Sequence, residues 1–164
     1  MMSNGLSLPE ELMGKIDHIL DHLQQKTRTD CIILADVSGQ VISTQGHMVD
    51  GTPSTVAALA AGDVAAMGEL TRQIGEENPH GSFFHEGDQK SIYLHNIAGS
   101  FILIVIFRAE TPIGLVRLFA KRAVEKLREL TIEFEEVIDK PSPVDSEDFK
   151  SGLTRELEQA FSDD

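Results

Sequence analysis

The chain has 164 residues, enough for one domain with a full core and an appendage, and its 41% hydrophobic and 25% charged residues are typical of a soluble globular protein. Its net charge of -13 repels phosphate backbones and anionic lipid, which argues against nucleic acid and membrane surfaces as partners. Because no stretch reaches the roughly 18 apolar residues that span a bilayer, and no signal-like segment opens the chain, we expect a cytoplasmic protein.

The first predicted element is an amphipathic helix that ends near Lys26. Ser7 and Glu10 have the spacing of a capping box at its start. His18 and His22, four residues apart on the exposed face, could hold a metal ion, but without a third ligand nearby we favour solvated surface. Its buried stripe is predicted at Leu8, Leu12, Ile16, Ile19, Leu20 and Leu23.

A β-hairpin follows, with strands at residues 30–37 and 40–44 joined by Ser38 and Gly39. The first strand is apolar on both faces, which predicts a central strand covered on both sides. Its Cys31, the only cysteine, can form no internal disulfide and is predicted to be a small buried hydrophobe. The second strand alternates and suits an edge.

Residues 52–75 are predicted to form one long helix, with Thr52 as cap, Pro53 at its first position and Gly75 at its end. One side gathers larger apolar residues and, near its middle, Asp63, whose burial without a partner would be costly. That side is predicted to carry Val56, Leu59, Val64, Met67, Leu70 and Ile74. The opposite side is predicted to carry Ala57, Ala58, Ala61, Gly62, Ala65 and Gly68, with Arg72 at its end.

The small residues of that second side predict a flat surface where the protein meets another protein at close range. The alternative is that loops of the same chain cover it.

Three further strands are expected at residues 81–85, 90–97 and 101–107, and the last is the most continuously apolar in the chain. Two central strands among five imply the sheet order 2-1-5-4-3. Phe83 and Phe84 then lie on an edge strand, which we expect to pair with a second copy unless the chain's own loops hide it.

The last long helix opens at Thr111 and Pro112. Its basic cluster could receive an acidic partner, although a solvated face is the commoner role of such charges. The cluster comprises Arg117, Lys121, Arg122, Lys126 and Arg128. Its buried stripe is predicted at Leu115, Phe119, Ala123, Leu127, Leu130 and Phe134.

The predicted domain covers residues 7–138, followed by a Pro-rich linker at 139–146 and an amphipathic helix or tail at 147–164. Phe149, Leu153 and Leu157 line one side of this tail and could dock into a partner's groove, or the tail could be mostly disordered. No glycine-rich phosphate loop, nucleophile elbow or zinc pattern is present, so we expect no cofactor, no metal and no active site.

The order helix, hairpin, long helix, three strands, long helix resembles the roadblock / dynein light chain family over roughly residues 8–130. Within that family the likeness is to the bacterial MglB group. Four short stretches carry the likeness by their joint order and spacing, at residues 59–62, 74–77, 84–87 and 113–118. The resemblance implies an α+β domain of order α-β-β-α-β-β-β-α whose five-stranded antiparallel sheet lies between helices.

The resemblance also implies a homodimer with paired middle helices that engages a small Ras-like GTPase of the MglA type. The implied role is stimulation of GTP hydrolysis in cell polarity or motility control. Arg72 is then the candidate for insertion into the GTPase, although a flat surface favours reshaping of the GTPase's switch loops. A passive dimeric scaffold for a GTPase or motor subunit is the alternative, and a ligand-sensing domain seeded by Asp63 is a third hypothesis.

Overall fold

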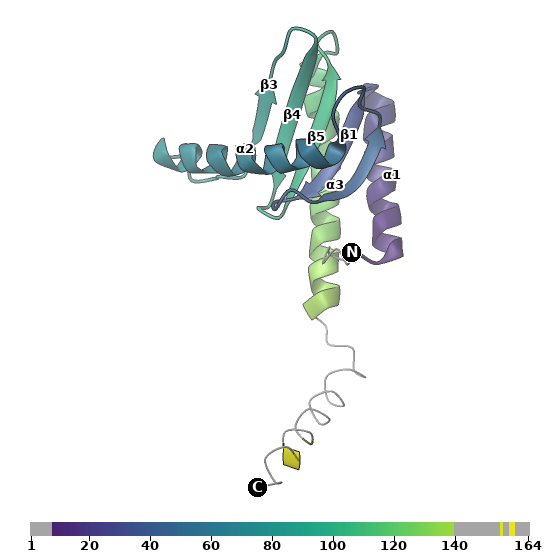
Figure 1. Cartoon of the computed structure of the whole chain (residues 1–164), viewed down its shortest axis with the longest axis vertical. Helices are drawn as coiled ribbons and strands as arrows, with labels where there is room; N and C mark the ends of the chain where they lie inside the picture. Colours follow the sequence, from purple (N-terminus) through teal and green to yellow (C-terminus); the bar gives the residue numbers. More distant parts are fainter. Residues whose placement is uncertain (1–7, 140–154, 156–157, 160–164) are drawn as a thin grey trace. The chain divides into compact units, whose positions relative to one another are not determined.

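The computed structural model of the protein describes residues 8–139 together with 155, 158 and 159 (Figure 1). The chain divides into two compact units, Met1–Leu130 and Thr131–Asp164. The predicted linker beyond residue 139 and the tail residues Phe149, Leu153 and Leu157 lie outside the described residues.

The elements of the described chain follow the predicted order. They are α1 (Glu10–Thr27), β1 (Cys31–Asp36), β2 (Val41–Gly46), α2 (Pro53–Gln73), β3 (Ser82–His85), β4 (Lys90–Ile97), β5 (Phe101–Arg108) and α3 (Ile113–Asp139). The strands form one antiparallel sheet in the order β2-β1-β5-β4-β3. The predicted fold class and strand order are therefore confirmed.

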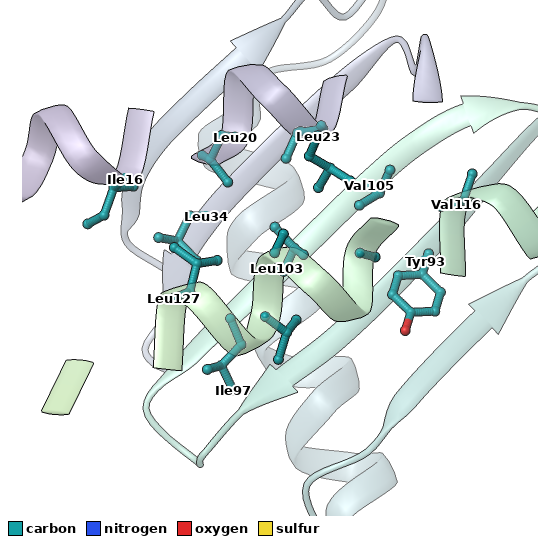
Figure 2. Close-up of a cluster of buried hydrophobic side chains, with 14 of the residues drawn as sticks. Ile16, Leu20, Leu23, Leu34, Tyr93, Ile97, Leu103, Val105, Val116 and Leu127 are labelled. Carbon is teal, nitrogen blue, oxygen red and sulfur yellow. The ribbon is translucent and has the colours of Figure 1, made fainter. Parts of the chain in front are cut away.

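The sheet separates two hydrophobic layers. On one face Ile33, Leu94 and Ile104 pack beneath α2. On the other face the sheet packs against α1 and α3, and Figure 2 shows side chains of both helices meeting over the strands. That second cluster includes Leu20 and Leu23 of α1, Leu103 and Val105 of β5, and Val116 and Leu127 of α3.

The two strands predicted to be central are neighbours. Ile33 lies opposite Ile104, and Leu34 lies opposite Leu103. All four side chains are buried because α2 covers one face and α1 and α3 cover the other. This two-sided cover is why both strands are apolar at every position except the last, Asp36 in β1 and Arg108 in β5. Cys31 is also fully buried, as predicted, and burial first and Asp30 second raise the pKa of its thiol.

Two helical details differ from the sequence predictions. Glu10 is the first residue of α1, and Pro9 precedes it without a side-chain cap, so Glu10 does not occupy the third helical position that a capping box needs. On α3, Leu115 is 36% exposed, whereas its neighbour Val116 is fully buried. Of the predicted α3 stripe, Ala123 and Leu127 are buried, and Phe119 and Leu130 are partly buried against the same core.

The turn between β1 and β2 is built around the carboxylate of Asp36. Its Oδ1 accepts hydrogen bonds from the backbone N–H groups of Ser38 and Gln40, each at 3.0 Å. Gly39 has a φ of 93°, in the left-handed region that glycine tolerates. A Cβ at Gly39 would lie 2.9 Å from the Cα of Ala58 on α2. The turn therefore packs directly against the start of α2, and only a residue without a side chain fits there.

Candidate interaction surface on α2 and β3

Local capping signals set the limits of α2. Thr52 is extended, and its hydroxyl oxygen accepts a hydrogen bond from the N–H of Thr55 at 3.3 Å. The helix starts at Pro53 and ends at Gln73, two residues before Gly75, whose φ is 86°. Figure 1 shows α2 crossing the sheet, with its C-terminal turns extending past β3. Those last turns therefore have no sheet beneath them.

The face of α2 that packs on the sheet consists largely of small residues. Ala57 is fully buried, Ala60 and Val64 are each 6% exposed, and Gly68 is buried. Ala57 and Gly68 were predicted on the outer, small-residue side, and the structure corrects this. Gly39 lets the hairpin turn approach Ala58 of this helix closely, whereas a Cβ added at Gly68 would meet no atom within 4 Å.

The outer face of α2 carries large apolar side chains that were predicted to be buried. Leu59 is 70% exposed, Leu70 is 53% exposed and Ile74 is 77% exposed. Asp63 is exposed too, so the costly burial expected for its carboxylate does not arise. Ala58, Gly62 and Ala65 are exposed as predicted, and Ala61 is half-buried. We call the exposed set Ala58, Leu59, Gly62, Ala65 and Leu70 the α2 surface.

Arg72 lies at the C-terminal end of the α2 surface. Its guanidinium group forms an ion pair with Glu69 Oε2 at 3.3 Å, and both side chains are about 60% exposed. An exposed pair of this kind is weak, because water screens it and both side chains lose freedom in forming it. Arg72 is therefore available to a partner, but nothing in the described chain holds it in one extended position.

A groove of about 480 Å³ runs between α2 and β3. Its walls include Leu59 and Met67 from α2 and Phe83 from β3, and its titratable side chains are Asp63 and His85. The two predicted edge aromatics point to opposite faces of the sheet, since successive side chains of a strand alternate. Phe83 lies on the α2 side, whereas the ring of Phe84 stacks on that of Phe107 with 6.0 Å between centroids.

The strand β3 forms one edge of the sheet. It pairs with β4 through four positions, from Ser82 opposite His95 to His85 opposite Ile92. Three of its four side chains are exposed, and Phe83 is half-buried. The predicted edge position is confirmed, and the α2 surface, the groove and the edge lie side by side in the fold.

The described residues contain no group of three or more His, Cys, Asp or Glu side chains that could hold a metal ion, and His18 and His22 are exposed. Within the same residues, no helix is both long and apolar enough to cross a bilayer.

A family model described as Roadblock/LC7 domain matches residues 15–107, which is more than half of the chain. The chain belongs to the Roadblock/LC7 family. The predicted family is therefore confirmed, and the sheet with α2 on one face and α1 and α3 on the other is its roadblock fold.

Among solved structures, this Roadblock/LC7 chain is similar to Myxococcus xanthus MglB, with 37% identity and a TM-score of 0.69 over 73% of this chain and 96% of that one. It also resembles the gliding protein MglB of Thermus thermophilus, with 24% identity and a TM-score of 0.71 over 80% of this chain and 99% of that one. An uncharacterised protein of Aquifex aeolicus is 22% identical over 151 residues, 92% of this chain and 93% of that protein.

The exposed leucines of α2 were not predicted, although the sequence carries a signal for them. Ala57, Ala60, Val64 and Gly68 recur at helical spacing and form a stripe as regular as the one formed by the larger residues. Choosing the larger residues as the buried stripe assumed that size decides burial. In α2 the smaller residues face the sheet, and Leu59 and Leu70 lie outside.

Proposed function

We propose that this protein is a homodimeric, cytoplasmic regulator of a small Ras-like GTPase of the MglA type, acting as a GTPase activator in cell polarity or motility. The observation that carries the proposal is the α2 surface, where Leu59 and Leu70 remain 70% and 53% exposed on a Roadblock/LC7 domain. Contiguous exposed apolar residues on a soluble domain mark a protein–protein interface. The 37% identity to Myxococcus xanthus MglB supports the same role.

A second copy of the chain is the occupant that best fits the groove beside α2. The groove is apolar, adjoins the open edge of β3, and is bordered by Leu59, which is otherwise left in water. A copy related by a two-fold axis would pair β3 with β3 and place its α2 against this one. The groove could instead admit a small apolar ligand near Asp63, and a monomeric protein would favour that role.

The edge pairing can be tested at Ser82, the first residue of β3. Gly81 C=O accepts a hydrogen bond from Asn96 N–H of β4, so by alternation the backbone N–H of Ser82 points away from β4. Ser82→Pro removes that outward donor at a position where an edge strand tolerates proline. We expect Ser82→Pro to raise the dimer dissociation constant about tenfold, as measured by sedimentation velocity. Ser82→Ala should leave that constant unchanged. Equal behaviour of the two variants would exclude β3 pairing.

The mechanism that we favour is reshaping of the GTPase's switch loops by the α2 surface, rather than insertion of Arg72. The surface is broad and apolar, and the exposed Arg72–Glu69 pair does not hold the guanidinium extended. We expect Arg72→Ala to keep stimulated GTP hydrolysis within about fivefold of the wild-type rate. A loss of about a thousandfold, the scale of an arginine finger, would show that Arg72 acts catalytically.

We further propose that Phe149, Leu153 and Leu157 dock on the GTPase and alter nucleotide exchange or affinity. Replacing all three with alanine in the full chain should leave the dimer mass unchanged and change the GTPase's nucleotide release rate several-fold. Because apolar burial supplies the docking energy, alanine in place of a polar tail residue, Ser151→Ala, serves as the control. Unchanged binding and unchanged nucleotide turnover would refute this docking.

The proposed function is tested by single-turnover GTP hydrolysis. A Ras-like GTPase from the same organism is loaded with GTP and mixed with increasing amounts of the protein. A saturable acceleration of hydrolysis supports the activator. Binding to the GTP form without acceleration would instead support the alternative, a passive dimeric scaffold for a GTPase or motor subunit. Absence of binding would contradict both.

A further inference from the structure

A second surface of the molecule combines basic and apolar side chains on α3. Five of the chain's 14 Lys and Arg residues lie between positions 117 and 128, where Glu125 is the only acidic residue. This concentration of positive charge occurs in a chain whose net charge is -13. We call Leu115, Arg117, Leu118, Lys121 and Arg122 the α3 surface.

All the side chains of the α3 surface are exposed. Leu118 is 48% exposed and Leu115 is 36% exposed, so two leucines lie among the charges. The Arg122 Cζ atom lies 5.3 Å from the centroid of the Phe119 ring, and Phe119 itself packs against the core. The ring therefore holds the Arg122 guanidinium near one place on the helix, which lowers the entropy lost when that group binds a carboxylate.

The electric field of two cations on this side of α3 reaches His95 on the neighbouring strand β4. His95 of β4 is half-buried, and its pKa is lowered first by burial and then by the charges of Arg128 and Lys121. Its Nδ1 lies 3.2 Å from the Tyr93 hydroxyl group.

We propose that the α3 surface binds an acidic, partly apolar segment of a second partner protein. Carboxylates of such a segment would pair with Lys121 and Arg122, and its apolar side chains would cover Leu115 and Leu118. The α3 surface lies on the opposite side of the sheet from α2 (Figure 1), so this inference does not depend on the proposed GTPase role. An anionic membrane is the less favoured occupant because the chain as a whole is strongly acidic.

The experiment uses the full chain and fluorescent synthetic peptides, with binding measured by fluorescence anisotropy. The test probe is an amphipathic helical peptide of Leu and Glu. A peptide with Lys in place of Glu tests the charge, and one with Ser in place of Leu tests the apolar contacts. We expect the Leu–Glu probe to bind at least tenfold more tightly than either comparison peptide, and its affinity to fall as salt screens the charges.

The Lys121→Glu/Arg122→Glu variant should bind the Leu–Glu probe about tenfold more weakly, because two exposed charge attractions become repulsions. The matched control is Lys26→Glu/Arg108→Glu, which makes the same charge change at exposed positions of α1 and β5 and should stay within twofold of wild type. Leu118→Ser, also at an exposed position, should by itself lower the affinity for the probe a few-fold relative to wild type, because it removes an apolar contact without changing the charge.

Equal effects of the α3 variant and the control would overturn the proposal, because only net charge would then matter. Lys121→Gln/Arg122→Gln provides a second, milder variant that leaves the fold undisturbed, and it should weaken the probe about threefold. Co-sedimentation of the wild-type chain with phosphatidylserine vesicles, lost in the α3 variant while no peptide binds, would assign the surface to a membrane instead.

Discussion

Leu59→Glu/Leu70→Glu is expected to abolish both self-association and stimulation of GTP hydrolysis. Each side chain is more than half exposed in the single chain, so the monomer should fold normally. In the proposed dimer both positions face apolar surface, and an unpaired carboxylate there costs several kcal/mol. We therefore expect the dimer dissociation constant to rise on the order of a thousandfold, and GTP hydrolysis to proceed at the unstimulated rate. Sedimentation velocity and single-turnover hydrolysis measure the two effects.

The matched control for this variant is Val41→Glu/Val49→Glu. Val41 and Val49 are 37% and 91% exposed, on β2 and in the loop that follows it, and neither belongs to the α2 surface or lines the groove. The control introduces the same two charges and should retain the dimer and the stimulation. Circular dichroism should show native folding for both variants. A dimeric, fully stimulating Leu59→Glu/Leu70→Glu protein would contradict the role assigned to α2.

Gly39→Ala is expected to destabilise the fold by about 2–5 kcal/mol. A left-handed φ of 93° costs a residue with a Cβ roughly 1–2 kcal/mol. The new methyl group would also meet the Ala58 Cα at 2.9 Å, and relieving that contact means moving the turn away from α2 at a further cost of about 1–3 kcal/mol. Urea unfolding measures the loss as a shift of the transition midpoint.

Gly51→Ala separates the two contributions to that loss. Gly51 has a similar φ of 81°, but the nearest atom to an added Cβ is the Met48 methyl carbon at 3.6 Å, an ordinary contact. Only the backbone cost applies, so the expected loss is about 1–2 kcal/mol. If both variants lose the same stability, the close packing of the hairpin turn against α2 contributes nothing measurable.

The arrangement of the strands could be predicted because their side chains report which faces are covered. The runs around Ile33 and Ile104 are apolar at every position, which only a strand covered on both faces allows. Two such strands have to be neighbours, and the hairpins on either side then fix the remaining order. The edge position predicted for β2 is confirmed, but Ser43 is buried and Val41 is exposed, the reverse of an apolar-in, polar-out pattern, where the β1–β2 pairing has an irregular register.

The orientation of α2 could not be predicted in the same way, because the helix offers two apolar stripes. The pattern alone does not say which stripe faces the sheet, and in the structure it is the stripe of Ala57, Ala60, Val64 and Gly68. The exposed leucines and the exposed Asp63 follow from this choice. On α3 the predicted stripe differs at its first position, where Leu115 is 36% exposed and Val116 is buried.

Sedimentation equilibrium of the purified full chain tests the central claim most directly. If two copies share their α2 surfaces and β3 edges, the measured mass should be twice the chain mass of 18.0 kDa at micromolar concentration. It should fall to one chain mass for Leu59→Glu/Leu70→Glu. A wild-type protein that remains at one chain mass at the highest attainable concentration would contradict the dimer, and with it the surface proposed to regulate the GTPase.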